Sequence, residues 1–500
     1  MFRINKHHKL LTFLLSAFIL TGCNKNLDQK PESTAGKDAI FGSEDGLKLY
    51  VNSFYNILPG INDTYKADDI SDYGARNLVA DYLRTGAYSS RQSTGWTWTN
   101  LRNVNYFLAN NNNPNIAEGV RNNYNGIARF FRAWFYFDMV KRFGDVPWIG
   151  KPMDVDDPSL YAGRDPRTLV MDSVLADLDY ACTHITLNDD KTRSLITKWV
   201  AYGLKSRVCL FEGTFRKYQT GYNLGSSANE WLQHAADASK AVMDSSGFTL
   251  NLSGGTDLSY RQLFISTAPV TNEVMLSDVS STSLAVYNDA NWYYTSSTYG
   301  VRFSFTRTFI NTYLNLDGTS FTDVPGHETM TFAQEVHGRD KRLKQTIRAG
   351  NYTRTSSGKT IPAPPVFSYT YTGYQPIKWS LDDDYYDNGA NNTNSICLMR
   401  YAEILLNYAE ARAELGQLTD EDWAKTIGAL RSRAGITEGL TTIPTVADPY
   451  LQANYFPDIS DPALLEIRRE RGIELALEGF RFYDLVRWKL GELLLQPWNG

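Results

Sequence analysis

The sequence predicts a mainly α-helical fold in which helix pairs scaffold a loop-rich region with a few short β-strands. Three observations support this prediction. Long segments place apolar residues three and four positions apart, as one buried face of a helix requires. Glycine or proline follows several of these segments, where a helix would end. Residues 251–395, in contrast, are rich in Ser, Thr, Tyr, Gly and Pro and contain short alternating runs typical of strands and loops.

The chain begins with a segment typical of a secretory signal. Basic residues precede an apolar run over residues 10–20. A helix of that length spans about 16 Å, whereas the hydrocarbon core of a bilayer is about 30 Å thick. The next residues, Leu20 to Cys23, resemble a bacterial lipobox, in which cleavage precedes a cysteine that carries lipid. We therefore predict a lipoprotein signal peptide over residues 1–22 and lipid attachment at Cys23. An ordinary signal with an unmodified cysteine is the alternative.

Three helices are predicted in the first part of the mature chain. In Glu44–Leu58, apolar residues recur three and four positions apart until a proline and a glycine end the pattern. Trp98–Leu108 repeats this spacing. A longer apolar stripe begins at Ile127 and ends near Gly144, which predicts a long helix.

Two helix pairs follow. Thr197–Phe215 and Ala228–Met243 are expected to be antiparallel, with alanines at the seam that let the two backbones approach closely. Ile396–Leu415 and Glu421–Arg433 form the second pair, with Gly416 as a C-terminal cap and a threonine–aspartate capping box opening the second helix. Such pairs resemble tetratricopeptide repeats with irregular spacing and long insertions.

Composition and motifs exclude several classes of protein. The net charge of −5 argues against a nucleic-acid partner, which would need a basic face. Apart from Cys23, the cysteines are Cys182, Cys209 and Cys397, an odd number without metal-ligand spacing. The sequence has no H-E-x-x-H motif, no G-x-S-x-G elbow and no glycine-rich phosphate loop. We therefore predict no catalytic residues, no cofactor and no enzymatic activity.

Ligand-binding residues are expected on the irregular loops, because loops on rigid scaffolds usually carry recognition. Sugar recognition needs flat aromatic faces together with amides and carboxylates. The segment Asp68–Asn77 and the segment Tyr287–Tyr294 with Tyr299 supply both kinds of group. Packing of these aromatic rings in the core is the alternative for each of them. The candidate ligand-binding residues are Tyr73, Arg76, Asn77, Trp96, Tyr287, Asn288, Trp292, Tyr293 and Tyr294.

An acidic loop offers weak metal candidates. Asp382, Asp384 and Asp387 could hold a structural Ca²⁺ through their carboxylate oxygens. The loop lacks the spacing of an EF-hand and its bidentate glutamate. A solvated loop without metal is therefore the favoured interpretation.

Four sequence blocks, together with the lipobox, resemble the SusD/RagB family of outer-membrane nutrient-binding lipoproteins. They are residues 98–108, 129–147, 400–411 and 467–488. Because the blocks occur in the family's order and are spread over most of the chain, we interpret residues 23–500 as a single SusD-like domain with an irregular insertion at about 251–395. Family members usually continue past the last block, so we expect the C-terminus at Gly500 to be incomplete.

The resemblance implies a function. It implies an outer-membrane lipoprotein that faces the cell exterior, captures a glycan or oligosaccharide, and delivers it to a SusC-like TonB-dependent transporter. A peptide-binding lid of the same transporter class is the alternative, and a surface glycosidase is a third hypothesis. Charged residues in the blocks, such as Arg132 and Glu474, are interpreted as ion pairs that lock neighbouring helices rather than as a catalytic site.

Overall fold

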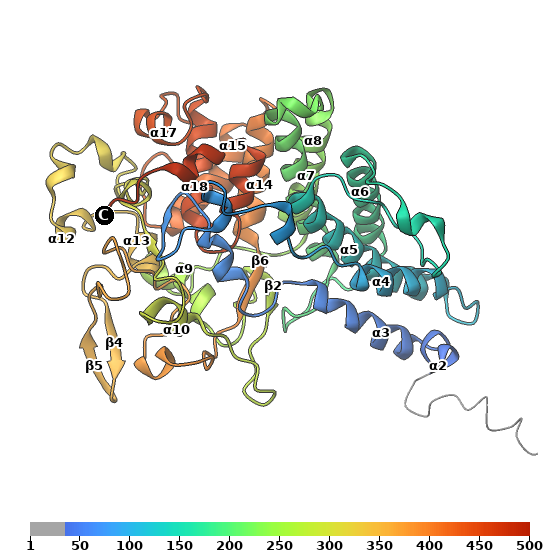
Figure 1. The fold of residues 1–500 in the computed structure, drawn as a ribbon. Coiled ribbons are helices and arrows are strands. Elements are labelled where there is room, and N and C mark those ends of the chain that lie inside the picture. Colours follow the sequence, from blue (N-terminus) through green and yellow to red (C-terminus); the bar gives the residue numbers. More distant parts are fainter. Residues whose placement is uncertain (1–35) are drawn as a thin grey trace, which may run out of the picture.

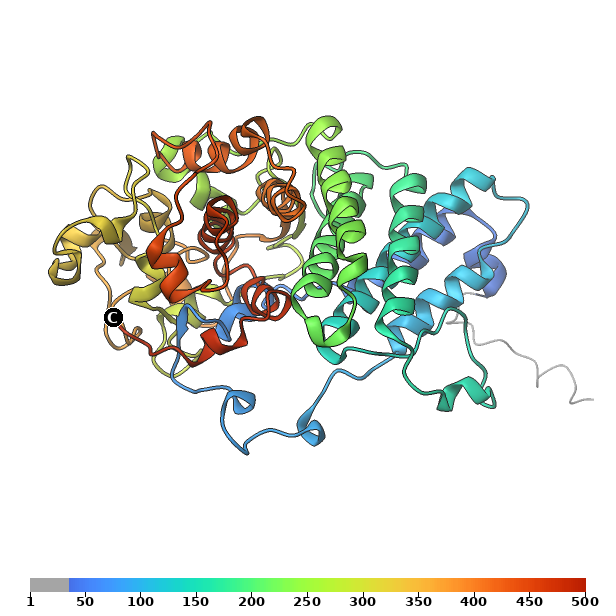
Figure 2. The same cartoon turned by 90° about the horizontal axis from the view of Figure 1, so that it is seen from above.

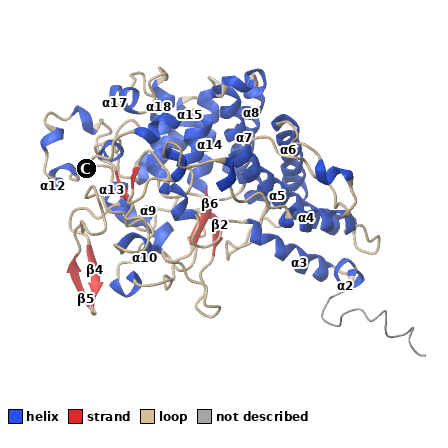
Figure 3. Ribbon diagram, viewed as in Figure 1, coloured by secondary structure: helices blue, strands red, loops and turns tan. Residues whose placement is uncertain are grey.

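The computed structural model describes residues 36–500, so the predicted signal peptide and Cys23 lie outside the described residues. The described chain is mainly α-helical, as predicted, and its paired strands form three small two-stranded sheets (Figure 3). A row of long helices stands beside a part built of shorter helices and loops (Figures 1 and 2). Within residues 36–500, no helix combines the length and the apolar character that crossing a bilayer requires.

The row of long helices comes from the first half of the described chain. Its longest member ends at Gly144, whose φ of +71° is readily adopted only by glycine. The prediction of a long helix ending there is confirmed. The helices of this row are α2 (Lys37–Phe41), α3 (Glu44–Asn52), α4 (Thr99–Asn110), α5 (Glu118–Phe143), α6 (Arg167–His184), α7 (Lys198–Tyr218) and α8 (Ala228–Ser245).

Helices α7 and α8 form the predicted antiparallel pair. The Ser206 and Ser239 hydroxyls share a hydrogen bond of 2.6 Å across the seam. Gly213 follows Ser206 by seven residues on α7, and Leu232 precedes Ser239 by seven residues on α8. A Cβ on Gly213 would lie 2.8 Å from the Leu232 side chain. The residue numbers of the contacts increase along α7 while they decrease along α8, so the two helices run antiparallel. The small residues at the seam therefore set the close approach of the two backbones.

The C-terminal helices pack beside α7 and α8 and join the row to the loop-rich part (Figure 2). The predicted capping box is present, because the Thr419 and Asp422 side chains bond each other's backbone N–H groups. Gly416, with a φ of +67°, follows the first helix of this pair as predicted. The elements are α14 (Tyr401–Glu414), α15 (Asp420–Trp423), a π-helical turn (Ala424–Gly428), α16 (Ala429–Arg433), α17 (Pro449–Asn454), α18 (Pro462–Glu474) and α19 (Arg481–Arg487).

One boundary in this region was predicted wrongly. The segment expected to begin a helix at Ile396 starts instead with strand β6 (Ile396–Arg400), and helix α14 begins at Tyr401. Strand β6 pairs antiparallel with β2 (Val274–Asp278). All five side chains of β6 are buried. A short run that is buried on every side has no polar face whose spacing would distinguish a strand from a helix.

Residues 251–395 contain short strands and loops, as predicted, but also helices that the prediction missed. The longest, α9 (Gly255–Ile265), buries Tyr260, Leu263 and Phe264 at helical spacing. The hairpin of β4 (Thr353–Ser356) and β5 (Lys359–Pro362) projects from this part (Figure 1). The other elements are α10 (Ala290–Thr295), α11 (Arg307–Ile310), α12 (Phe332–Glu335), α13 (Arg342–Thr346) and β3 (Ser304–Phe305), which pairs with β1 (Gly74–Ala75).

A buried cluster of charges joins the loop-rich part to the C-terminal helices, and we call it the ionic core. The Glu474 carboxylate accepts hydrogen bonds from Arg342 at 2.8 Å, from Arg400 at 2.6 Å and from Arg433. Burial alone would raise the pKa of Glu474, but these arginines hold it well below its usual range. The ionic core consists of Glu273, Asp340, Arg342, Lys378, Arg400, Arg431, Arg433, Glu470, Glu474 and Glu478.

Ion pairs also join the helices of the row. Arg132 of α5 donates two hydrogen bonds to Asp177 of α6, at 2.6 and 2.8 Å. The Asp145 carboxylate accepts a bond from the backbone N–H of Arg167, the first residue of α6. Bidentate arginine–carboxylate pairs fix the orientation of the two side chains in addition to pairing their charges. The interpretation of the charged family blocks as helix-locking ion pairs is confirmed here and in the ionic core.

Candidate ligand-binding site

Two segments that are far apart in the sequence meet on the loop-rich part. The first follows a 3₁₀ helix, η2 (Thr64–Asp69), and includes strand β1. The second runs from Tyr287 through α10 to β3. Strands β1 and β3 pair antiparallel, and the backbone N–H of Asn77 donates to the Val301 carbonyl at 2.8 Å. The Tyr293 hydroxyl also donates to the Asp69 carboxylate, so the structure brings together the two segments that the sequence singled out for binding.

Asp289 is the centre of the polar contacts between these segments. Its carboxylate accepts hydrogen bonds from the Tyr65 and Tyr299 hydroxyls and from the Lys66 ammonium, the last at 2.8 Å. The same ammonium lies 5.0 Å from the centre of the Tyr293 ring. We call these five residues the Asp289 cluster. Its bonds hold η2 against α10 and fix the position of the surrounding loops.

The edge of the Asp289 cluster carries a guanidinium and an amide. Arg76 is half-buried, and its Nε has no partner among residues 36–500. The neighbouring Asn77 is exposed. Arg76 also lies 3.9 Å from the carboxylate of Asp69, whose pKa burial raises to about 6 against the opposing effects of the Tyr293 hydroxyl, Arg76 and Lys66. A charged donor and an exposed amide therefore stand side by side at this edge.

An aromatic pair adjoins the Asp289 cluster through Tyr299. The rings of Trp292 and Tyr299 stack with their centres 3.6 Å apart and their planes 13° from parallel. Both residues are half-buried, so part of the pair stays open to solvent. The Tyr299 hydroxyl bonds Asp289, and this bond together with burial raises the pKa of Tyr299 to about 12. A partly exposed aromatic surface thus adjoins fixed polar groups, which is the usual composition of a small-molecule site.

Four of the predicted ligand contacts are corrected by their burial. Tyr73 is fully buried, and its hydroxyl donates to Asp68 at 2.6 Å. Asn288 is fully buried and donates to the Asn394 carbonyl at 2.8 Å. Tyr293 and Tyr294 are buried too, with their hydroxyls bonded to Asp69 and to the backbone. These side chains hold the loops together and present no face on which a sugar could stack.

Two further candidates lie apart from the Asp289 cluster. Trp96 is exposed and packs edge-on against Trp98 and Phe143 at the ends of α4 and α5. Tyr287 is half-buried, and its hydroxyl donates to the Thr282 carbonyl at 3.4 Å. The candidates that remain near the cluster are Arg76, Asn77 and Trp292. Their contact with ligand stays a prediction.

The acidic loop uses its carboxylates for contacts within the protein. Asp382 accepts two bonds from Arg261, and Asp387 accepts two from Arg354. Asp384 accepts a bond from the Ser356 hydroxyl. The described part of the chain contains no group of three or more His, Cys, Asp or Glu residues placed to hold a metal ion. A structural Ca²⁺ at this loop stays an untested hypothesis.

Sequence reasoning missed Tyr65 and Lys66. Both lie on η2, immediately before the acidic segment that was singled out, and an aromatic–basic pair next to that segment was the available signal. Nothing in their spacing indicates that they meet Asp289, which is more than two hundred positions away. That contact exists only in the folded chain.

Comparisons with known proteins agree with the fold. A profile described as "SusD family" matches residues 273–497, and one described as "Starch-binding associating with outer membrane" matches residues 27–210. The SusD-like protein P2 of Formosa agariphila is 24% identical, with 98% of this chain and 92% of that protein covered.

Solved structures give the same result. A SusD-like protein from Bacteroides fragilis superposes with a TM-score of 0.68 at 24% identity, covering 93% of this chain and 90% of that one. A SusD-like carbohydrate-binding protein from the same species gives 0.65 at 18% identity, covering 91% and 88%. At such identities the structural likeness establishes the fold, which is SusD-like. Together with the two profiles and the ordered sequence blocks, it shows that the chain belongs to the SusD/RagB family.

Proposed function

We propose that this protein captures glycans at the cell surface and performs no chemistry on them. The observation that carries the proposal is the half-buried Trp292–Tyr299 stack, which the Tyr299 hydroxyl fixes to Asp289, on the paired segments that also carry Arg76 and the exposed Asn77. Family membership supports it, because one matching profile is described as starch-binding and one structural relative as carbohydrate-binding. The aromatic pair would take the apolar face of a pyranose, while the amide and guanidinium would bond its hydroxyls.

Affinity at one such site is expected to be modest. Each hydroxyl exchanges a bond to water for a bond to protein, with a net gain of about 0.5 to 1.5 kcal/mol. The tyrosines of the Asp289 cluster are already held by internal bonds, so little side-chain entropy is lost when ligand binds. Specificity would therefore come from the fixed positions of the groups more than from the strength of any one contact.

We further propose that the protein acts on the outer membrane, facing the cell exterior, as the lipid-anchored partner of a SusC-like TonB-dependent transporter. The lipobox-like residues Leu20 to Cys23 support the anchor, and the profile described as associating with the outer membrane supports the location. Captured glycan would pass from the loop-rich part into the transporter. Co-purification of one such transporter with the native lipoprotein tests the pairing, and its absence under mild solubilisation would count against it.

The function is tested by affinity electrophoresis of the soluble protein, beginning at Asn24, in gels that contain different polysaccharides. Retardation by one class of glycan supports the proposal. No retardation by any glycan contradicts polysaccharide capture and favours the alternative of a peptide ligand.

Replacement of Trp292 by alanine should weaken glycan binding about tenfold. A pyranose face covers about 50 Å² of ring, and at about 25 cal/mol per Å² its loss costs about 1.3 kcal/mol, which is close to a tenfold change in Kd. The measurement is the retardation of Trp292→Ala in the same gels. Trp498→Ala, the same change at an exposed tryptophan near residue 500, is the matched control and should bind like the native protein. Unchanged retardation of Trp292→Ala would remove this residue from the site.

Replacement of Cys23 by alanine should move the protein from the membrane fraction to the soluble fraction. Lipid chains hold a protein on a membrane through about 0.8 kcal/mol per buried CH₂ group, and only the cysteine thiol can carry them. Fractionation of cells followed by immunoblotting measures this. Cys182→Ala, which removes a buried cysteine instead, should leave the distribution unchanged. Membrane retention of Cys23→Ala would exclude this residue as the anchor.

A further inference from the structure

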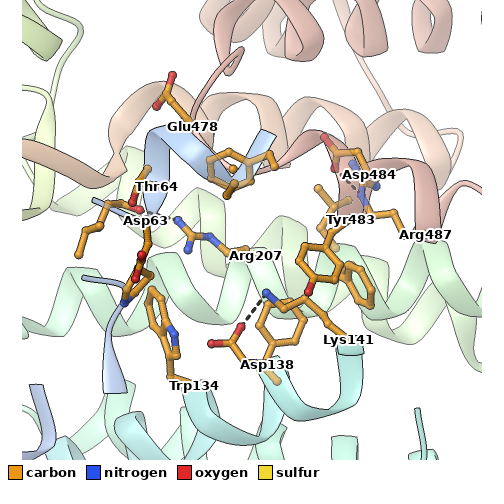
Figure 4. A pocket seen from close by; sticks show the side chains of 18 of the residues that line it. Asp63, Thr64, Trp134, Asp138, Lys141, Arg207, Glu478, Tyr483, Asp484 and Arg487 are labelled. Atoms are coloured by element: carbon orange, nitrogen blue, oxygen red, sulfur yellow. Dashed lines mark hydrogen bonds and ion pairs between the residues drawn. The ribbon is translucent and has the colours of Figure 1, made fainter. Parts of the chain in front are cut away.

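A second hollow lies behind η2, on the side away from the Asp289 cluster. It has a volume of about 270 Å³ and opens between η2, α5, α7 and α19 (Figure 4). Thr64 and Ala67 line it, whereas Tyr65 and Lys66 of the same 3₁₀ helix turn toward Asp289. A 3₁₀ helix repeats every three residues, so its two faces belong to different residues. One face of η2 therefore lines this hollow, and the other contacts the Asp289 cluster.

The cations of this hollow are already neutralised. The Lys141 ammonium bonds Asp138 at 2.7 Å and lies 4.4 Å from the centre of the Tyr483 ring (Figure 4). The Arg207 guanidinium bonds both oxygens of Glu403, at 2.6 and 2.7 Å. Binding an anion here would require breaking one of these pairs. The electrostatics of the hollow therefore favour a ligand without negative charge.

The walls combine aromatic rings with one unused donor. Phe137, Phe480 and Tyr483 supply flat apolar surface. Trp134 also lines the hollow and is only 5% exposed, yet its indole N–H has no hydrogen-bond partner among residues 36–500. A buried donor without a partner costs about 1 to 3 kcal/mol, and such groups usually have a partner that comes from water or ligand. The indole of Trp134 stands beside Asp138 in the hollow, so a ligand there would meet a donor and an acceptor together (Figure 4).

We propose that this hollow is a second glycan-binding subsite that takes a single neutral sugar ring. The ring would stack on the aromatic walls, accept a hydrogen bond from Trp134 and donate one to Asp138. A volume of about 270 Å³ lies just below the usual range for small-molecule sites, which begins at about 300 Å³, so it holds one ring and not an oligosaccharide. The inference rests on the proposed glycan-binding function, but it concerns a separate site with separate residues.

The test uses the soluble protein from Asn24 onward in the Trp292→Ala background, so that the first site is weakened. Neutral monosaccharides (glucose, galactose, mannose, xylose and arabinose) are titrated at millimolar concentration and followed by saturation-transfer NMR. Ala67 is exposed at the rim of the hollow, so Ala67→Trp fills the space without disturbing the core. Ala67→Ser changes the same position without filling it and serves as the matched control.

We expect at least one monosaccharide to bind in the Trp292→Ala background. Ala67→Trp should abolish that binding and Ala67→Ser should leave it unchanged. Trp134→Phe, which keeps an aromatic ring but removes the donor, should weaken binding about fivefold, the effect of one lost hydrogen bond.

Absence of monosaccharide binding in the Trp292→Ala background overturns the subsite, and so does binding that survives Ala67→Trp. A different result would contradict the proposed function, namely that no polysaccharide retards the native protein. The two results can be told apart. If a polysaccharide retards the native protein but the Trp292→Ala variant binds no monosaccharide, glycan capture is supported and only the second subsite is excluded.

Discussion

Replacing Glu474 by glutamine is expected to lower the free energy of unfolding by about 3 to 5 kcal/mol, the usual cost of removing one partner from a buried ion pair. The carboxylate is fully buried and accepts bonds from three arginines. The ionic core has five carboxylates and five cations, so the variant would leave one uncompensated positive charge in the interior. Glutamine keeps the shape, so the loss reports charge and not a cavity. Urea unfolding at pH 7, followed by circular dichroism, measures it.

The matched control is Glu421→Gln, the same chemical change at an exposed i,i+4 pair with Lys425. Exposed pairs contribute little because water screens them, so the urea midpoint of this variant should equal that of the native protein. A Glu474→Gln variant that unfolds at the native midpoint would contradict a stabilising role for the ionic core.

Replacing Gly428 by alanine is expected to lower the free energy of unfolding by about 2 to 3 kcal/mol, in the range for overpacked interiors. Gly428 ends the π-helical turn between α15 and α16. A Cβ there would lie 1.9 Å from the carbonyl oxygen of Leu440 and 2.9 Å from its carbonyl carbon. Because the obstacle is backbone, the connecting chain has to move. Thermal unfolding of the variant, with urea titration for the free energy, tests the expectation.

Gly119→Ala is the same substitution at another position, and its effect on the free energy of unfolding is expected to have the opposite sign. Gly119 is exposed in the first turn of α5, and a Cβ there would meet no atom within 4 Å. Alanine is favoured over glycine in helices by up to about 1 kcal/mol, so this variant should be as stable as the native protein or slightly more so. Equal destabilisation by the two substitutions would exclude the contact with Leu440 as the cause.

The helices with long apolar stripes were predictable from the sequence. Helices α7 and α8 appear close to their expected bounds, and α5 ends where expected, at Gly144, but begins at Glu118, nine residues before its expected start at Ile127. Strand β6 was not predictable, because all of its side chains are buried and its partner β2 lies more than one hundred positions away. Helix α9 was missed within a segment whose serine and glycine content favours loops.

The candidate site was predictable only in part. The sequence indicated the two segments, since aromatic and amide groups gather there, and the structure brings them together through the bond of the Tyr293 hydroxyl to Asp69. Which aromatic rings remain accessible depends on packing between distant segments. Trp292 and Tyr294 are two positions apart in one short helix, yet the first is half-buried and the second is almost completely enclosed. The hollow beside Trp134 needs four elements to be in place, so no local pattern indicates it.

The ionic core has a consequence for the order in which the protein folds. It unites Glu273 with Glu474, which are 201 positions apart, through the shared partners Arg400 and Arg433. A chain exported from its N-terminus delivers α18 after nearly all other elements. Until α18 arrives, Arg342, Arg400 and Arg433 have only Asp340 and Glu273 as partners in the ionic core, so their charge is compensated only in part. Because burying an uncompensated charge costs several kcal/mol, we expect the centre of the molecule to close fully only when α18 supplies its carboxylates.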